Sequence, residues 1–315
     1  MRLGRALSIA ICTLIAATGC SDESSRADTP ASDVQVADAQ ASDQAPGVQV
    51  PDVQAPGGPA PSAQAPNVQT TVPPGTDAIT ARAVAEAQAV GAGQARTAVA
   101  LLDLHTGALY SAGDIDEPYA AASVVKVFIA ARLLAEGRAA DPRVRDLMWR
   151  MITLSDDDAA TRLYGLAGAE KLVPWIAHRY GIAGLAPTDQ PNWWGLTRIT
   201  ARGVVTFYAA VAADPVVAPW LMDAMAQTEP YGSDGFYQYF GLPSAAASWR
   251  VKQGWMCCLE GLSRMHSTGY IDNDRYAVAL LAAGPPSMYE EGDGAELLTA
   301  MARALMPNGV VPTSA

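Results

Sequence analysis

Residues 119–137 read YAAASVVKVFIAARLLAEG, a stretch that carries the first of three chemical motifs in this chain. From Ser123 onward the apolar residues recur at helical spacing, and Gly137 supplies a stop signal, which predicts a helix over 123–137. The helix therefore begins with the pattern Ser-x-x-Lys. Side chains three positions apart lie on one face of a helix, so we expect the hydroxyl of Ser123 to lie within reach of the amine of Lys126.

Together Ser123 and Lys126 can support nucleophilic catalysis. A neutral amine can accept the hydroxyl proton, and a charged amine can stabilise the alkoxide, helped by the positive potential at a helix N-terminus. The chain has three lysines against eighteen arginines, and of the two side chains only the amine can lose its proton readily. The alternative interpretation is a serine cap followed by a solvated lysine.

Two further motifs follow along the chain. Ser-Asp-Asp at 155–157 stands at the start of a predicted helix over 156–166, and Lys-Gln-Gly at 252–254 ends a predicted strand over 249–254. The other predicted helices cover 79–91, 142–153, 170–179, 200–212, 219–227 and 294–306, the other strands cover 97–104, 108–112, 265–271 and 276–282, and 181–196 is a long loop. Strands at both ends with helices between them indicate one sheet with a helical insertion, which is an α+β fold.

Composition excludes several classes of function. The formal net charge is −11, whereas a nucleic-acid surface needs clustered Lys and Arg, so we expect no nucleic-acid partner. Beyond the N-terminus no apolar run reaches the ~20 residues of a membrane-spanning helix. Four cysteines without a Cys-x-x-Cys pair and three scattered histidines predict neither a disulfide scaffold nor a metal site.

The N-terminal quarter of the chain is predicted to be an export signal and a spacer. Residues 1–20 combine two arginines, a short apolar segment and Ala-Thr-Gly-Cys, which is typical of a signal peptide whose Cys20 is lipidated; an ordinary secretory signal is the alternative. Residues 21–78 hold nine prolines and no Leu, Ile, Phe, Tyr or Trp, so we expect a disordered spacer. The folded domain is predicted over 79–310. Lipidated Cys20 would anchor it at the outer face of the plasma membrane, in the cell envelope.

The order of the three motifs resembles the serine β-lactamase and penicillin-binding-protein superfamily, whose motifs are Ser-x-x-Lys, Ser-Asp-Asn and Lys-Thr/Ser-Gly. The resemblance spans roughly residues 79–308. Trp193-Trp194, the stretch 232–243 and KQGWMCC at 252–258 look closest to the LppW lipoproteins of mycobacteria. This resemblance implies a class A β-lactamase-like fold, with an antiparallel sheet flanked by N- and C-terminal helices and an inserted helical subdomain.

The resemblance also implies a role for each motif residue. Ser123 would be the nucleophile and Lys126 the amine that activates it. Ser155 would pass a proton to the leaving group, and Lys252 would hold the charge of the network and attract an anionic substrate. The backbone N–H groups of Ser123 and Trp255 would form the oxyanion hole. No cofactor is implied, and the substrate would be a cell-wall peptide or a β-lactam-like amide.

Three departures from the family pattern leave the activity open. Asp157 replaces an amide, and a carboxylate beside Lys126 would keep that lysine protonated. Gln253, next to Gly254 of the third motif, replaces a hydroxyl. Asp189 is the one carboxylate in the loop where the family carries its deacylating Glu; it is either a general base or a solvated turn residue. The chain is thus either a slow serine hydrolase or an envelope binding protein that has lost turnover.

Other residues near the motifs have two interpretations each. Trp193 and Trp194 either form a wall beside the cleft or pack the loop down, and we expect packing. Met256 is expected in the core. Cys257 and Cys258 form a strained vicinal bridge, two thiols or an intermolecular bond.

Overall fold

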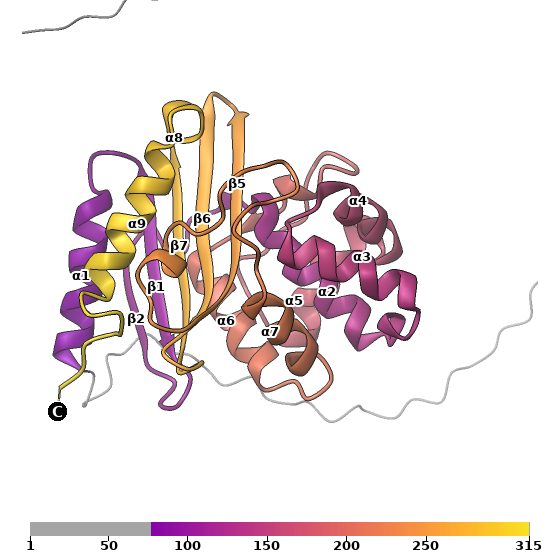
Figure 1. Cartoon of the computed structure of the whole chain (residues 1–315), viewed down its shortest axis with the longest axis horizontal. Coiled ribbons are helices and arrows are strands. Elements are labelled where there is room, and N and C mark those ends of the chain that lie inside the picture. The colour runs from indigo at the N-terminus through magenta and orange to yellow at the C-terminus, as the bar shows by residue number, and fades with distance from the viewer. Residues whose placement is uncertain (1–76, 315) are drawn as a thin grey trace, which may run out of the picture. The chain divides into compact units, whose positions relative to one another are not determined.

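The computed structural model describes residues 77–314, and its centre is a five-stranded antiparallel sheet in the order β2-β1-β7-β6-β5 (Figure 1). The strands are β1 (Arg96–Asp103), β2 (Leu109–Gly113), β5 (Trp249–Leu259), β6 (Leu262–Ile271) and β7 (Tyr276–Gly284). Strands from both ends of the domain therefore share one sheet, and the predicted α+β fold is confirmed.

Helices cover both faces of this sheet. On one face lie α1 (Ala78–Gly91), α8 (Ser287–Glu290) and α9 (Asp293–Leu305). On the other side lie α2 (Lys126–Ala135), α3 (Pro142–Thr153), α4 (Asp157–Leu166), α5 (Leu172–Tyr180), α6 (Ala201–Ala212) and α7 (Ala218–Ala226). Because both faces are covered, every residue of the central strand β7 is buried.

Short elements complete the architecture. They are the 3₁₀ segments η1 (Ala122–Val125), η2 (Arg138–Ala140), η3 (Ala169–Lys171), η4 (Trp194–Leu196) and η5 (Leu242–Ser244), and the two-stranded pair β3 (Tyr119–Ala120) with β4 (Arg198–Ile199). These pieces and α8 were not predicted, because two to four residues are too few for a periodic pattern. The predicted helix 123–137 begins in the structure as η1 and continues as α2.

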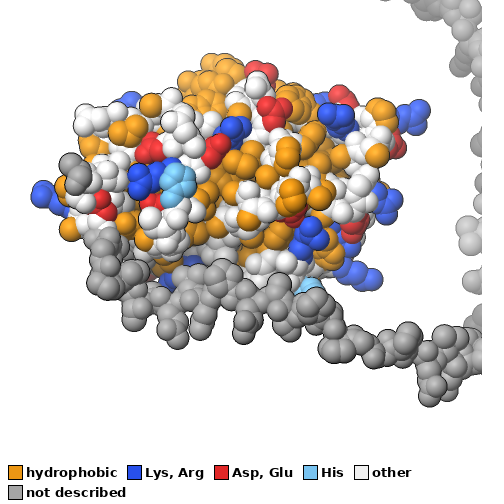
Figure 2. Space-filling model, turned by 90° about the horizontal axis from the view of Figure 1, so that it is seen from below, with side chains coloured by type: hydrophobic (Ala, Val, Ile, Leu, Met, Phe, Trp, Pro, Cys, Tyr) orange, Lys and Arg blue, Asp and Glu red, His pale blue; other side chains and the backbone are white. Residues whose placement is uncertain are grey.

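Two hydrophobic clusters hold the layers together, one on each side of the sheet. The larger cluster lies under the inserted helices, and at its centre the rings of Phe128 and Phe207 meet edge to face with centroids 4.7 Å apart. The smaller cluster joins the sheet to α1 and α9. On the face seen in Figure 2, basic and acidic side chains lie interspersed among exposed hydrophobic ones.

The two ends of the described part meet at Asp77. One of its carboxylate oxygens caps α1 by accepting from the N–H groups of Ile79 and Thr80 at 2.9 and 3.2 Å. The other oxygen accepts from the backbone N–H and the hydroxyl of Ser314 at 2.5 and 2.9 Å. The backbone N–H of Val311 also donates to Asp272 at 2.8 Å, so packed chain extends past residue 310.

The features predicted for the N-terminus lie outside the described residues. These are the signal peptide 1–20, lipidation of Cys20 and the spacer 21–78, of which only residues 77 and 78 are described, at the start of α1. Within residues 77–314, no helix combines the length and the apolar character that crossing a bilayer requires.

We predict that Phe128→Ala destabilises the domain by about 3–5 kcal/mol, because it removes a fully buried ring from the larger cluster and leaves a cavity. Ile79→Ala is the control, since Ile79 is 47% exposed and should cost less than about 1 kcal/mol. Urea unfolding of both variants measures the difference. Equal midpoints would contradict the central place given to Phe128.

Candidate active site

Ser123 and Lys126 are brought together by a tight turn of chain at the junction of η1 and α2. In a 3₁₀ segment side chains three residues apart are nearly eclipsed, and the Nζ of Lys126 lies 2.9 Å from the Oγ of Ser123. The preceding residue, Ala122, has a φ of 47°, an uncommon conformation for a residue with a Cβ. The first motif thus forms the contact that its spacing predicts.

Ser155 joins the second motif to both lysines. Its Oγ lies 3.0 Å from the Nζ of Lys126 and 2.9 Å from the Nζ of Lys252, and its carbonyl oxygen accepts from Lys126 at 2.6 Å. Ser155 has a φ of 51°, and such strained backbone persists only where the surroundings hold it, commonly at functional sites. The surroundings here include Asp156, which caps α4 by accepting from the N–H of Ala159.

Lys252 reaches the site from β5, the edge strand of the sheet. Its Nζ also donates to the carbonyl oxygen of Gln253 at 3.0 Å. Two residues along, a Cβ on Gly254 would lie 3.1 Å from the carbonyl oxygen of Ala121 and 3.1 Å from a methyl group of Val124. The absence of a side chain at Gly254 therefore lets η1, which carries Ser123, lie directly against the strand that carries Lys252.

Burial sets the electrostatics of the two lysines. Lys126 and Lys252 are both 0% exposed, and loss of hydration lowers the pKa of each amine below its ordinary value. The pKa of Lys252 is lowered further by the nearby charge of Lys126. Burial therefore favours the neutral amine, which is the form that can accept a proton from Ser123.

Asp157 opposes this effect at Lys126. Its Oδ1 lies 2.5 Å from the Nζ of Lys126, and this contact raises the lysine pKa, although by less than burial lowers it. The predicted pairing of the two side chains is therefore present. The Asp157 side chain is 73% exposed, so solvent screens the pair and weakens its hold on the proton.

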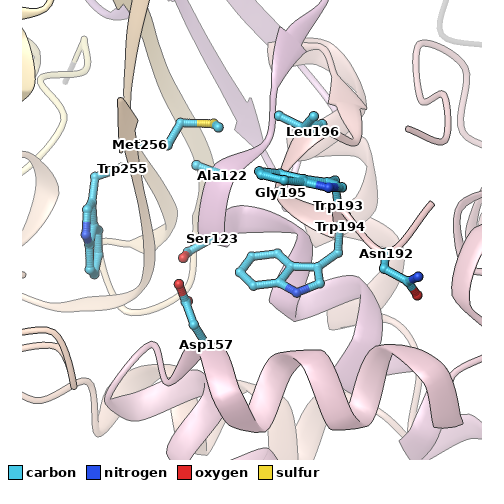
Figure 3. Close-up of a pocket in the computed structure, with 10 residues that line it drawn as sticks. All are labelled: Ala122, Ser123, Asp157, Asn192, Trp193, Trp194, Gly195, Leu196, Trp255 and Met256. Atoms are coloured by element: carbon cyan, nitrogen blue, oxygen red, sulfur yellow. The ribbon is translucent and has the colours of Figure 1, made fainter. Parts of the chain in front are cut away.

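A cavity of about 260 Å³ opens beside Ser123 (Figure 3). It is lined by Ala122, Ser123, Asp157, Asn192, Trp193, Trp194, Gly195, Leu196, Trp255 and Met256. Two expectations about these residues were wrong. Trp193 is 62% exposed and forms a wall of the cavity, and Met256 lines the cavity and is only half-buried. Trp194 also lines the cavity, but it is half-buried and packs against the larger cluster, as expected. Loop 181–196 has no periodicity, so the sequence did not indicate which face its indoles take.

Gln253 is the predicted site residue that the structure turns away from the cavity. Its side chain is fully buried, and its Nε2 donates to the carbonyl oxygens of Gln238 and Phe240 at 3.0 and 2.6 Å. Successive side chains of a strand point to opposite faces, so Lys252 and Gln253 cannot both face Ser123. In this structure the Gln253 amide is not available to a substrate, which corrects the sequence interpretation.

Trp255 lines the cavity from β5, and Asp234 holds its ring. The indole Nε1 donates to Oδ2 of Asp234 at 2.8 Å, and the ring stacks on Phe236 with centroids 4.8 Å apart. Asp234 stands in a stretch without a motif, so its part in the site was not predicted; the one signal for it was the likeness of 232–243 to LppW lipoproteins. As the outer strand, β5 has backbone N–H groups on its free edge, where an oxyanion hole would form.

Asp189, the candidate base, lies elsewhere. It forms an ion pair with Arg198, is 78% exposed and does not line the cavity. The structure therefore agrees with the interpretation of Asp189 as a solvated turn residue. His266 is buried on β6, and its Nε2 contacts the carbonyl oxygen of Ala120 at 2.8 Å. Burial lowers the pKa of His266 to about 4, so it stays neutral at physiological pH.

Cys257 and Cys258 are paired as a vicinal disulfide where β5 leaves its regular register. With Glu290 they form the one group among residues 77–314 whose ligand atoms lie close enough together to hold a metal ion, all within 4.8 Å. Sulfurs joined in a disulfide are not thiolates, and thiolates are the form that binds metals. We therefore interpret the disulfide as a structural part of β5 beside the cavity rather than as a candidate metal site.

Comparison with solved structures identifies the class of fold. The chain superposes on a class A β-lactamase from Mycobacterium abscessus with a TM-score of 0.57, 16% identity and coverage of 71% of this chain and 97% of that one. PBP-A matches with a TM-score of 0.56 and 19% identity over 75% and 98% of the two chains, and a PBP-A variant was solved as an acyl-enzyme complex with penicillin G. The fold is that of class A β-lactamases and PBP-A. No family model matches the sequence.

A comparison of sequences identifies the family. LppW of Mycobacterium tuberculosis, named as a lipoprotein, is 35% identical over 240 residues, which cover 72% of this chain and 74% of LppW. LppW of Mycobacterium bovis matches with the same identity and coverage. The chain belongs to the LppW lipoprotein family.

We predict that Asp157→Asn lowers the pKa of Lys126, because the substitution removes the carboxylate that favours the charged amine. The rate at which a fluorophosphonate labels Ser123 should rise with pH as Lys126 loses its proton. In the variant this rise should move to lower pH, by about one unit or less since solvent screens the pair. Asp158→Asn, an exposed neighbour on α4, controls for net charge. If the pH dependence of labelling were the same in Asp157→Asn and the wild type, the contact between Asp157 and Lys126 would not be what limits the reactivity of Ser123.

Proposed function

We propose that the protein is a serine hydrolase of the β-lactamase and penicillin-binding-protein type, which forms an acyl-enzyme on Ser123. The observation that carries the proposal is the 2.9 Å contact between the Ser123 hydroxyl and the buried amine of Lys126, whose pKa burial lowers. A hydroxyl beside an amine that can be neutral is an activated nucleophile.

The proposed acylation uses four side chains. Neutral Lys126 accepts the proton of Ser123 Oγ as that oxygen bonds to the carbonyl carbon of an amide or ester. The Trp255 and Ser123 N–H groups would stabilise the resulting oxyanion. When the tetrahedral intermediate collapses, Ser155 gives its proton to the departing nitrogen or oxygen and recovers one from Lys126, which lies 3.0 Å away. Lys252 holds the Ser155 hydroxyl in place.

Deacylation is the slow step of this proposal. Of the ten residues that line the cavity, Asp157 is the one that carries a carboxylate, and it is paired with Lys126. Asp189 is engaged with Arg198 outside the cavity. Without a free carboxylate to activate water, the acyl group would stay on Ser123 for a long time. Candidate substrates are cell-wall peptides and β-lactam-like amides, and the penicillin G complex of the PBP-A variant supports the second class.

A second function is favoured by a separate observation. Where the superfamily motifs carry an amide and a hydroxyl, this chain has Asp157, which contacts Lys126 at 2.5 Å, and Gln253, whose amide donates to backbone carbonyls away from the cavity. Neither position therefore offers a ligand a neutral side-chain donor. We propose as the alternative an envelope protein that binds a ligand in this cavity without turnover.

In both cases we place the protein outside the cytoplasm, anchored to the outer face of the plasma membrane by a lipid on Cys20. The lipoprotein name of the LppW relatives and the sequence of residues 1–20 support this location. The proposal requires neither a metal nor an organic cofactor, and no nucleic-acid partner.

We expect a fluorophosphonate and penicillin G each to add one adduct to the wild-type protein in intact-mass spectra, and none to Ser123→Ala. The reason is that Ser123 alone pairs a cavity-lining hydroxyl with an amine. Ser111→Ala, which removes an exposed serine on β2, should label like the wild type. If neither reagent labels the wild type, the hydrolase proposal fails and the binding alternative stands; equal labelling of Ser123→Ala would place the nucleophile elsewhere.

We also expect Cys20→Ser to abolish incorporation of a labelled fatty acid when the full chain is expressed in a mycobacterial host, and to release the protein from the membrane fraction. Cys258→Ser, at an exposed cysteine far along the chain, is the control. Fatty-acid label that persists in Cys20→Ser would contradict lipidation at this residue.

A further inference from the structure

The charge at the mouth of the cavity is negative. Asp157 is the one charged residue among the ten that line it, and 73% of its side chain is exposed. A second carboxylate, the exposed Asp234, holds the Trp255 ring of the cavity wall through a hydrogen bond of 2.8 Å. The two lysines lie behind this surface and are both fully buried. A ligand that enters the cavity therefore meets carboxylates before it meets ammonium groups.

The cavity is also lined by three indole rings, those of Trp193, Trp194 and Trp255. In Figure 3, Trp255 stands on one side of the Ser123 hydroxyl and Trp194 on the other, and Asp157 points toward the hydroxyl from α4. The Trp194 ring is fixed by a hydrogen bond from its Nε1 to the hydroxyl of Thr161 at 3.2 Å. Trp193, at 62% exposure, borders the same cavity. The faces of indole rings attract cations. Two of these rings already lie beside the buried amines, since the Nζ of Lys126 is 4.9 Å from the centroid of Trp194 and the Nζ of Lys252 is 5.7 Å from that of Trp255. Trp193 is therefore the ring left to meet a cation from solvent.

Groups that could bind an anion are turned away from the cavity. Gln253 donates to the backbone of Gln238 and Phe240. Arg264, on the neighbouring strand, is 5% exposed and donates to carbonyl oxygens of its own strand. Among the described residues, the cavity therefore offers a carboxylate-bearing substrate no exposed cation.

We infer that this cavity selects substrates whose acyl part carries an alkylammonium group a few bonds from the carbonyl that Ser123 attacks, and disfavours acyl parts with a carboxylate at that place. The attraction would come from the exposed ring of Trp193 and from the carboxylates of Asp157 and Asp234. As a statement about substrates, this inference rests on the proposed hydrolase function; as a statement about binding, it does not. It reverses the preference for an anionic substrate that the sequence analysis attached to Lys252.

A set of three 4-nitrophenyl esters tests the substrate preference. The acyl groups are 4-(trimethylammonio)butyrate, its uncharged carbon isostere 5,5-dimethylhexanoate, and glutarate, which carries a carboxylate. Acylation of the wild-type protein is measured by the release of 4-nitrophenol. We expect the cationic ester to react at least about tenfold faster than the isostere, and the glutarate ester to react more slowly than both. Equal rates, or a faster glutarate ester, would overturn the inference and leave the hydrolase proposal intact.

Two conservative variants locate the source of the preference. Asp157→Asn and Asp234→Asn should each reduce the ratio of the cationic to the neutral rate by about threefold, because each removes one screened charge. The ratio is informative because any change in Lys126 reactivity affects both esters alike. Asp158→Asn should leave the ratio unchanged, since Asp158 is exposed on α4 but does not line the cavity. A ratio that falls equally in all three variants would assign the preference to net charge and contradict the site.

Binding to Ser123→Ala separates the inference from turnover. Calorimetry compares choline with its uncharged isostere 3,3-dimethylbutan-1-ol, and we expect choline to bind at least about fivefold more tightly. If no ester acylates the wild type but choline shows this preference, the hydrolase proposal fails and the cation site stands. If the two ligands bind equally or not at all, the cation site is rejected.

Discussion

Two lysine side chains buried around one serine hydroxyl impose the main constraint on this molecule. Lys126 and Lys252 are both 0% exposed, and both donate to Ser155 Oγ. A buried ammonium group is costly unless acceptors or a carboxylate compensate it, and two of them repel each other. Each segment around them supplies an acceptor: η1 gives the Ser123 hydroxyl, the start of α4 gives Ser155 and Asp157, and β5 gives a backbone carbonyl. To hold this arrangement, Ser155 adopts a left-handed backbone conformation, which is unfavourable for a residue with a Cβ.

The parts of the fold that the sequence predicted are those with a sustained period. Helix α3 has the predicted bounds, and the contact of Ser123 with Lys126 followed from their spacing. The prediction for Gln253 failed because the Lys-Gln-Gly motif specifies only the order of residues. Neighbouring side chains of a strand point to opposite faces, so Gln253 points away from the side that Lys252 occupies. The orientation of Trp193 could not be inferred, since an irregular loop has no repeating face. Asp234 was missed because it acts through the ring of Trp255, a contact between residues that no local pattern links.

The fold matches that of class A β-lactamases and PBP-A, but the candidate site departs from the motifs of that superfamily. Ser123, Lys126, Ser155 and Lys252 stand where those motifs carry serine and lysine. Around them, Asp157 replaces an amide and indole rings enclose the nucleophile. Burial and Asp157 act on the Lys126 proton with opposite signs, and burial is the stronger influence. In the proposed hydrolase, the protonation of Lys126 and the reactivity of Ser123 would thus depend on a balance between loss of hydration and one exposed carboxylate, which a single substitution at residue 157 would shift.

The hydrogen bonds between Asp77 and Ser314 determine where the domain would be attached if the chain were anchored to a membrane. Chain enters and leaves the described part at this one point, beside α1, while the cavity lies on the other side of the sheet among η1, α4 and β5. A tether that pulls at Asp77 therefore applies its load to the cap of α1 and to the C-terminal residues that share this carboxylate, and the strand that carries Lys252 bears none of it directly. If the proposed lipid on Cys20 anchors the chain, force from the membrane would thus enter the domain at the cap of α1 and not at the candidate site.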